Sequence, residues 1–254
     1  MTDLTGRTVL LTGASKGIGA ETARVLGAAG GHLIAHYNTD EAGARAATSE
    51  LPAERTLLLQ ADLSDPAAAR DLWRRALAWC GGVDVLVNNA AVLVESPLDG
   101  TDDDWDGVWS AIYATNVLGP MALSREAVQH FRSRGSGVLI TMSSWAAQRG
   151  SGNPHLLAYA ASKAALKAAT QTIARAHAAE GVLAYVVAPG MVRTQMSEVA
   201  AQRTGGEAAA SAGLAMGEWV PPAEVAELIA FLATGTRRHL SGATFDVNGA
   251  SYIR

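Results

Sequence analysis

The sequence predicts an α/β fold: a single domain over residues 1–254, with a doubly wound parallel sheet of about seven strands and helices on both faces. Short apolar runs alternate with longer helical patterns along the whole chain, as in repeated βαβ units. Polar clusters directly follow most of these runs. Ligands of such sheets bind beyond the carboxyl ends of the strands, so we expect the functional residues at that edge.

Composition narrows the possible functions. The chain has 254 residues, of which 49% are hydrophobic, enough to bury one large core. A net charge of −4 gives no sign of a nucleic-acid partner, and no basic run suggests a membrane surface. Cys80 is the only cysteine, and we predict no metal site and no disulfide. No signal peptide pattern or apolar run of roughly 18 residues is present, so we expect a soluble, cytoplasmic protein that acts on a small molecule.

The first predicted strand, residues 8–12, leads into a glycine-rich turn and a helix over residues 18–29. Backbone N–H groups at such a turn, together with the helix N-terminus, can bind an anion, and glycines let a diphosphate approach closely. The spacing is Gly-x-x-x-Gly-x-Gly. We therefore predict a dinucleotide cofactor, bound by loop residues Gly13, Ser15, Lys16, Gly17, Ile18 and Gly19.

Two other motifs overlap this turn. A Walker-type phosphate loop ends in Gly-Lys-Ser/Thr. Here Lys16 comes before Gly17 instead of after a glycine, so we reject the Walker-type interpretation. Gly13-Ala14-Ser15-Lys16-Gly17 also matches the Gly-x-Ser-x-Gly elbow of serine hydrolases. Such an enzyme needs an earlier strand and a late histidine, but only twelve residues precede Gly13, and His239 is expected in a surface turn. A hydrolase that uses Ser15 stays an alternative.

The second predicted strand, residues 32–37, bears on the choice of cofactor. An acid at its end would bind the adenosine ribose and select NAD, whereas neutral and basic groups leave room for a 2′-phosphate. The strand ends in Tyr37, Asn38 and Thr39, and Thr39-Asp40-Glu41 is typical of a helix N-cap followed by first-turn acids. Lys16 offers a counter-charge in the glycine loop. The sequence favours NADP(H) and leaves NAD(H) possible.

Five more strands are predicted, over residues 56–61, 83–87, 138–142, 183–187 and 243–247. Asparagines or serines at the end of such strands can order the backbone around a ligand, or simply cap a turn. The strands after the second are followed by Asp62-Leu63, Asn88-Asn89, Ser143-Ser144 and Pro189-Gly190.

Tyr159 and Lys163 begin an alanine-rich run, residues 158–180, that contains no Pro or Gly and is therefore predicted to be helical. Residues four apart share one helix face, so the phenol and the ammonium should be neighbours. A nearby positive charge favours phenolate, and lowering the pKa of Tyr159 from ~10 by about three units takes roughly 4 kcal/mol. The pair is a candidate proton donor and acceptor, although the same spacing also occurs as a core-edge ring beside a solvated lysine.

In this order, the motifs resemble those of the short-chain dehydrogenase/reductase family, and the resemblance covers essentially the whole chain. It implies a Rossmann-like fold, a homotetramer or homodimer, and an NAD(P)-dependent enzyme that interconverts a carbonyl and a secondary alcohol, such as a 3-oxoacyl-type or other ketone reductase. The matching segments are Thr12-Gly13-x-x-x-Gly17-Ile18-Gly19, Asn88-Asn89-Ala90, Ser144, Tyr159-x-x-x-Lys163 and Pro189-Gly190.

The resemblance also implies a role for each matching residue. Tyr159 would be the general acid and base, Lys163 would lower its pKa and bind the nicotinamide ribose, and Ser144 would bind the reacting oxygen. Asn116 would hold a water relay behind the lysine. Tyr159 is implied in cofactor binding too, and the further residues implied in it are Asp62, Leu63, Asn89, Ala90, Ala91, Pro189, Gly190, Val192 and Thr194.

The chain also departs from the family pattern. Ala91 stands where a glycine is usual, and the run 105–116 before Asn116 is long. Ser144 and Tyr159 are further apart than is common, which predicts a lip over the substrate at residues 150–155 and leaves Ser143 as an alternative to Ser144. Residues 191–220 are small and apolar enough to form a lid. A non-catalytic NADP(H)-binding sensor is the alternative function, and turnover of NADPH with any ketone would exclude it.

Overall fold

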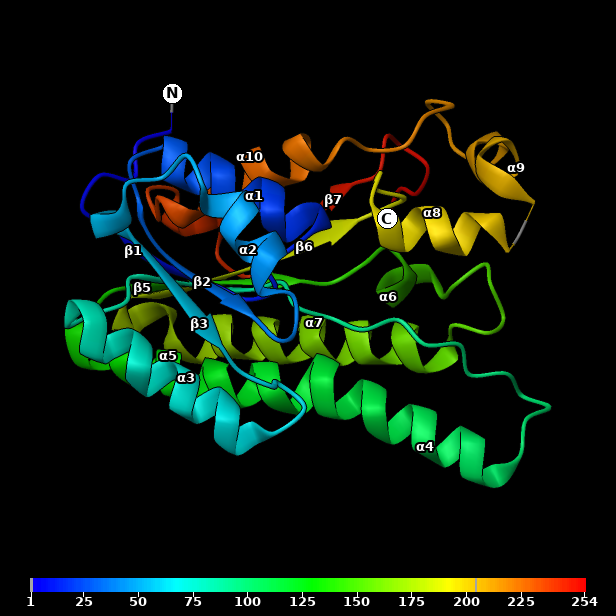
Figure 1. The fold of residues 1–254 in the computed structure, drawn as a ribbon, viewed down its shortest axis with the longest axis horizontal. Coiled ribbons are helices and arrows are strands. Elements are labelled where there is room, and N and C mark those ends of the chain that lie inside the picture. Colours follow the sequence, from blue (N-terminus) through cyan, green and yellow to red (C-terminus); the bar gives the residue numbers. More distant parts are fainter. Residues whose placement is uncertain (1, 204) are drawn as a thin grey trace.

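The computed structural model describes residues 2–203 and 205–254, and it contains a parallel sheet of seven strands in the order β3-β2-β1-β4-β5-β6-β7 (Figure 1). Each observed strand overlaps one of the seven predicted runs, and the predicted α/β fold class is confirmed. The chain reverses direction across the sheet between β1 and β4, which lie side by side. The strands are β1 (Thr8–Leu11), β2 (His32–Tyr37), β3 (Thr56–Gln60), β4 (Val85–Asn88), β5 (Gly137–Met142), β6 (Val182–Pro189) and β7 (Thr244–Val247).

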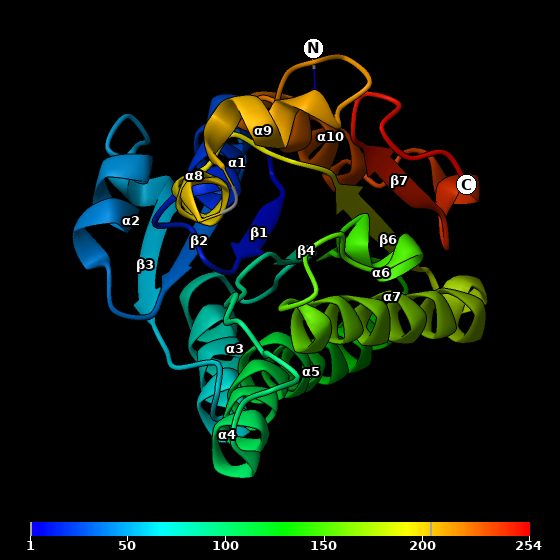
Figure 2. The same ribbon diagram turned by 90° about the vertical axis from the view of Figure 1, so that its right-hand side faces the viewer.

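Helices cover both faces of the sheet. The helices are α1 (Gly17–Ala28), α2 (Glu41–Thr48), α3 (Pro66–Cys80), α4 (Asp102–Tyr113), α5 (Gly119–Arg134), α6 (Ala146–Arg149), α7 (Leu157–His177), α8 (Gln195–Gln202), α9 (Gly206–Ala212) and α10 (Pro222–Ala233). Figure 2 shows α1 and α10 on one face and α3, α5 and α7 on the other, with α4 extending α5 beyond the sheet. Among the described residues, the structure has no helix that combines the length and apolar character needed to span a bilayer.

The sheet is buried on both faces because successive residues of its strands enter two different cores. In β1, Val9 and Leu11 join the core under α1 and α10, whereas Leu10 joins the core under α3 and α5. In the second core, the rings of Trp73 and Phe131 meet edge to face, with centroids 6.2 Å apart. This packing holds the carboxyl ends of the strands in fixed register, at the edge where the polar clusters lie.

The helix ends follow local sequence signals, with one correction. Pro66 occupies the first turn of α3, and the Asp65 side chain caps it by accepting the Ala67 N–H at 2.7 Å. At α2 we expected Thr39 as the cap and Asp40 as a first-turn acid. Instead Asp40 is the cap and accepts the Gly43 N–H at 2.8 Å, because the helix begins at Glu41.

The predicted lid, residues 191–220, is an excursion from the end of β6 that contains α8 and α9. A parallel bridge between Val192 and Val220 closes its base, with the Val220 N–H 2.8 Å from the Met191 carbonyl. The excursion lies over the carboxyl edge of the sheet, on the α1 side (Figures 1 and 2). That this excursion acts as a lid stays a prediction.

Candidate functional site

The end of β5 and the first turns of α7 bring Ser144, Tyr159 and Lys163 together. The Ser144 hydroxyl hydrogen-bonds the Tyr159 phenol, and its oxygen also accepts the Ala146 N–H at 3.1 Å. Ser143 points the other way, because its hydroxyl donates to the Lys163 carbonyl at 2.9 Å. The structure thus places Ser144 rather than Ser143 beside the phenol, despite the long segment between Ser144 and Tyr159.

The predicted lowering of the Tyr159 pKa is wrong for this structure. Burial raises the pKa of Tyr159 to about 12, and the hydrogen bond from Ser144 opposes this only in part. Lys163 does not offset the burial, because its Nζ lies 5.8 Å from the Tyr159 ring centre and donates to the Met142 carbonyl at 2.9 Å. The phenol is therefore protonated near neutral pH and can act as a proton donor.

Lys163 is itself a buried cation. Its side chain is 3% exposed, and burial lowers its pKa to about 8. A buried ammonium without a carboxylate partner is costly and typical of functional sites. The hydrogen bond to the Met142 carbonyl fixes its direction, along the crevice at the end of β5.

Asn116 lies in a π-helical turn, Ala114–Leu118, between α4 and α5. Its amide pairs with Val92 in both directions: Nδ2 donates to the Val92 carbonyl at 2.9 Å, and Oδ1 accepts the Val92 N–H at 2.8 Å. Nδ2 also lies 3.2 Å from the Ser162 hydroxyl, one residue before Lys163. The π turn accommodates the extra length noted in the run 105–116, and it keeps Asn116 facing α7.

The glycine loop is held from both sides. Asn89 donates from Nδ2 to the carbonyls of Thr12 and Gly13, at 2.9 and 3.1 Å. The Thr12 hydroxyl accepts the N–H groups of Asn89 and Ala90, at 2.9 and 3.0 Å. A Cβ at Gly19 would overlap the Gly13 carbonyl oxygen, so this position requires glycine for the helix to approach the turn. The start of α1 therefore packs directly against the glycine turn.

Strand β2 contains no acid, and the residues at its end are those expected beside the adenosine of a cofactor. Tyr37, Asn38 and Thr39 follow one another at the strand end, and the Asp40 carboxylate is used in capping α2. Lys16 is exposed on the loop. Asp62, after β3, is exposed and accepts the Ser64 N–H at 2.9 Å, a bond that lowers its pKa. Leu63 is buried beside Gly119.

The end of β6 carries the remaining predicted contacts. Pro189 is its last residue, and the Gly190 N–H donates to the Val247 carbonyl at 2.9 Å. Thr194 caps α8 by accepting the Ser197 N–H at 3.3 Å. Its methyl group faces Gly17, where a Cβ would come within 3.2 Å of it. The start of the lid thus touches the glycine loop across the mouth of the site.

These residues gather at the carboxyl edge of the sheet: a glycine turn, polar residues after β2, a strand that contains no acid, and a phenol one helical turn from a buried cation. The described residues contain no group of three or more His, Cys, Asp or Glu side chains that could hold a metal ion. The glycine turn at the N-terminus of α1 is a backbone arrangement that can bind phosphate groups.

Comparison with known proteins identifies the family. The model of the short chain dehydrogenase family matches residues 7–204. The chain is 35% identical over 256 residues to 3beta-hydroxysteroid dehydrogenase 1 of Eggerthella lenta, covering 97% of this chain and 94% of that protein. The chain belongs to the short-chain dehydrogenase family. This confirms the resemblance read from the motifs, and the protein is an oxidoreductase of that family.

Other members support the assignment. The short-chain dehydrogenase is 34% identical over 250 residues to the 3-oxoacyl-acyl-carrier-protein reductase of Escherichia coli, covering 98% of each protein. A short chain dehydrogenase from Burkholderia cenocepacia, solved in complex with NADP, matches it with a TM-score of 0.87 and 31% identity over 98% of each chain. A 3-oxoacyl reductase from Agrobacterium tumefaciens with NADP bound also has a TM-score of 0.87, at 30% identity over 98% of this chain and 95% of that one.

The hydrolase alternative does not fit this short-chain dehydrogenase. The Ser15 hydroxyl donates to the Asp40 carbonyl at 2.7 Å, so it is not paired with a base. His36, which does contact the loop, uses both ring nitrogens on the backbone of Gly13 and Ala61. Ser15 is thus a loop residue rather than a nucleophile.

Sequence reasoning missed two residues of the short-chain dehydrogenase site. Ser96 lies in the loop after β4 and connects this loop to the lip. Its N–H and its hydroxyl both donate to the His155 carbonyl, at 2.6 and 3.2 Å, and its hydroxyl oxygen accepts the Ala158 N–H at 3.2 Å. The extra residues between Ser144 and Tyr159 thus form α6 and a tethered turn. His36 is the second; a histidine inside an otherwise apolar strand was its only sequence signal.

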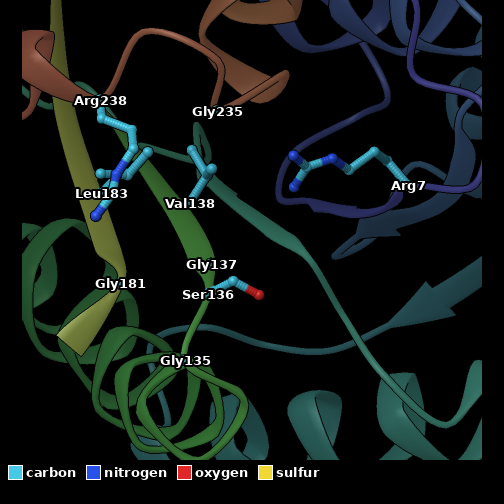
Figure 3. Close-up of a pocket in the computed structure, with 9 residues that line it drawn as sticks. All are labelled: Arg7, Gly135, Ser136, Gly137, Val138, Gly181, Leu183, Gly235 and Arg238. Atoms are coloured by element: carbon cyan, nitrogen blue, oxygen red, sulfur yellow. The ribbon is translucent and has the colours of Figure 1, made fainter.

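A separate cavity of about 240 Å³ opens at the opposite, amino-terminal edge of the sheet (Figure 3). In Figure 3, Arg7 and Arg238 flank a floor formed by Val138 and Leu183. It is lined by Arg7, Gly135, Ser136, Gly137, Val138, Gly181, Leu183, Gly235 and Arg238, and by none of the predicted site residues of the short-chain dehydrogenase.

Proposed function

We propose that the protein interconverts a carbonyl compound and a secondary alcohol by hydride transfer with NADP(H), in one catalytic domain that spans residues 1–254. The observation that carries this proposal is the hydrogen bond between the Ser144 hydroxyl and the Tyr159 phenol, one helical turn from the buried Lys163 side chain. A phenol in this position, on the same sheet edge as the glycine loop, suits proton donation to a carbonyl group that is being reduced.

Each residue has a defined part in reduction. When bound, the nicotinamide supplies hydride to the carbonyl carbon. Ser144 and Tyr159 hold the carbonyl oxygen, and the Tyr159 hydroxyl gives it a proton as negative charge develops there. Lys163, whose ammonium is directed by the Met142 carbonyl, can bind the nicotinamide ribose. Asn116, through Ser162, holds the first turns of α7 in place and can orient a water that returns the proton. Oxidation of the alcohol runs through the same steps in reverse.

NADP(H) is favoured, and NAD(H) is possible. The end of β2 offers Tyr37, Asn38 and Thr39 around a 2′-phosphate, and the Asp40 carboxylate is used by the helix cap. Lys16 is exposed and can supply the counter-charge. Two structurally similar relatives hold NADP. The other cofactor contacts that we propose are Gly13, Ser15, Gly17, Ile18, Gly19, Asp62, Leu63, Asn89, Ala90, Ala91, Pro189, Gly190, Val192 and Thr194.

The substrate is a ketone with an apolar body, of the 3-oxoacyl type or another class. Seven exposed apolar side chains lie on the segments around the proposed site, namely Val92, Val94, Leu98, Leu157, Met196, Val199 and Met216. They come from the loop after β4, the start of α7 and the lid, so closure of the lid would bury apolar surface against the substrate. Two relatives carry the names of a hydroxysteroid dehydrogenase and a 3-oxoacyl reductase.

We also propose a homotetramer, or a homodimer, in the cytoplasm. Ile112 is the one buried residue of α4, all of which is described, and Trp105, Trp109 and Tyr113 form a ladder of rings along it, with centroids 5.4 and 5.7 Å apart. A helix this exposed and aromatic suits an interface with a second copy. Sedimentation of the purified protein tests the assembly.

The test of function is turnover. Wild-type protein is mixed with NADPH or NADH and a panel of 3-oxoacyl thioesters, cyclic ketones and steroid ketones, and loss of the reduced nicotinamide absorbance is followed. We expect turnover with NADPH, and a fall in kcat of roughly 10²–10⁴-fold in Tyr159→Phe with unchanged NADPH affinity. Ser144→Ala and Ser143→Ala form a matched pair, of which only the first should lower kcat strongly. NADPH binding with no turnover of any substrate would support the sensor alternative.

A further inference from the structure

His36, the fifth residue of β2, joins three segments of the cofactor half of the molecule. Its Nδ1 lies 3.1 Å from the Gly13 nitrogen in the glycine loop, and its Nε2 lies 3.0 Å from the Ala61 carbonyl, directly after β3. Its own carbonyl accepts the Ala14 N–H at 2.9 Å. The ring is 2% exposed. One buried side chain therefore connects the glycine turn with the strand end that leads to Asp62.

The partners of His36 fix its protonation state. A backbone N–H can only donate, so Nδ1 must present its lone pair to Gly13. The hydrogen must then reside on Nε2, which donates to the Ala61 carbonyl. Both ring nitrogens are satisfied only in this neutral tautomer. In agreement, burial lowers the pKa of His36 to about 4.

Gly13 is held at both of its polar groups. His36 accepts its N–H, and Asn89 donates to its carbonyl at 3.1 Å. Without His36, the Gly13 N–H and the Ala61 carbonyl would each lose this hydrogen-bond partner. The backbone of the Gly13 turn would then be free to rotate. Because the ring is buried and neutral, it can influence a diphosphate only through the backbone that it holds.

We propose that His36 is a positioning residue that sets the Gly13 turn for the cofactor's diphosphate and keeps Ala61 and Asp62 in register with it. This inference rests on the proposed binding of a nicotinamide dinucleotide. His36 does not touch the reacting atoms, so its loss weakens cofactor affinity and leaves the chemical step at saturating cofactor nearly intact.

The test compares His36→Phe, which keeps a flat ring but removes both hydrogen bonds, with His36→Gln, whose amide can accept and donate. NADPH affinity is measured by the fluorescence of the bound nucleotide, and kcat and KM by turnover. We expect His36→Phe to raise the NADPH Kd about 10-fold or more, equivalent to the loss of one well-placed hydrogen bond, and to change kcat less than about 3-fold. His36→Gln should recover most of the affinity.

A matched control is Tyr185→Phe, which removes a part-buried hydrogen bond, from the Tyr185 hydroxyl on β6 to the Arg237 carbonyl at 3.2 Å. It should lower thermal stability without changing the NADPH Kd. The inference is overturned if His36→Phe binds NADPH as wild type does, or if Tyr185→Phe weakens binding equally. If wild-type protein binds neither NADPH nor NADH, the proposed function fails instead.

A measurement on wild-type protein covers the case in which a variant does not fold. Nitrogen NMR of protein labelled in its histidines distinguishes the two neutral tautomers, and His36 should show the Nε2–H form well below the pH at which exposed histidines titrate. Its Nδ1 resonance should move when NADPH is added, because Gly13 then takes up its bound geometry. An Nδ1–H tautomer, or a resonance unchanged by bound NADPH, contradicts the proposal.

Discussion

The two edges of the sheet handle polar groups in opposite ways. At the carboxyl edge, Lys163 and His36 are 3% and 2% exposed, and their hydrogen bonds go to backbone groups rather than to acids. At the amino edge, one ion pair lies near the surface: Arg134 is 3.1 Å from Asp84, with side chains 40% and 19% exposed. The carboxyl edge therefore carries polar groups that weaken the fold, and the amino edge carries groups that barely affect it.

This difference teaches where function constrains the sequence. A buried cation without a counter-ion lowers stability, and the cost persists only where the site requires it. An exposed ion pair contributes at most about 1 kcal/mol in either direction. We expect substitutions at the carboxyl edge to separate activity from stability, and substitutions at the amino edge to change stability alone.

The largest effect should come from Lys163→Met. We expect kcat to fall by roughly 10²–10⁴-fold, because the site loses the cation that we propose to hold the nicotinamide ribose beside Tyr159. Stability at pH 7 should stay equal or rise. The pKa of Lys163 is lowered from 10.5 to about 8, which corresponds to a penalty of roughly 3 kcal/mol for the charged form, reduced in the variant by the unpaired Met142 carbonyl. Turnover assays and urea unfolding measure the two quantities.

Lys167→Met is the control for this substitution. Lys167 lies one turn further along α7 and donates to Gln148 Oε1 at 3.2 Å, away from Tyr159. Its replacement should leave kcat nearly unchanged. If both variants lose activity to the same extent, the carboxyl edge depends on general helix packing, and the distinction between the two edges is lost.

The second effect is a pH dependence of stability caused by His36. Its pKa is lowered from 6.5 to about 4, mainly by burial; the hydrogen bond to the Ala61 carbonyl opposes this shift, Arg75 adds to it, and Asp62 opposes it. The unfolded state therefore binds more protons between these values, so the stabilisation is complete above pH 6.5 and is lost as the pH falls toward 4. The loss amounts to roughly 3 kcal/mol.

Urea unfolding of wild type and His36→Gln at several pH values measures the contribution of His36 to the pH dependence of stability. The carboxylates and His130 titrate in both proteins, so the difference between the two curves isolates His36. We expect the variant to show the flatter curve between pH 6.5 and 4. Parallel curves would mean that His36 is solvated in solution, in which case it does not belong to the buried polar groups of the carboxyl edge.

Much of this site could be predicted from the sequence because its signals are local. The glycine turn, the asparagines after β4 and the Tyr159–Lys163 spacing each lie within a few residues, and the structure brings them to one edge. What failed depends on distant partners. The Tyr159 pKa is decided by burial, His36 acts on Gly13 and Ala61, 23 and 25 residues away, and Ser96 bonds His155, 59 residues away. The catalytic and cofactor roles of the site residues stay predictions.

The third effect compares two glycines in left-handed backbone. Gly17 (φ +57°) lies at the carboxyl edge, and a Cβ there would come within 3.2 Å of Thr194. Gly235 (φ +64°) lies at the cavity of the amino edge, and a Cβ there would come within 3.1 Å of Val138. Alanine at either position should lower the free energy of unfolding by about 1–2 kcal/mol. Only Gly17→Ala should also weaken NADPH binding, measured by fluorescence titration; equal affinities in the two variants would contradict this.

The smallest effect is expected from Arg134→Ala at the amino edge. The ion pair with Asp84 is partly exposed, and the Asp84 carboxylate keeps a second partner, the Thr8 N–H at 2.8 Å, so no buried charge is left unpaired. We expect a loss of less than about 1 kcal/mol in urea unfolding, smaller still at high salt, with kcat and NADPH affinity unchanged. If the loss were comparable with the loss caused by protonation of His36, charged groups at the amino edge would also stabilise the fold. The two edges would then differ in chemistry but not in their contribution to stability.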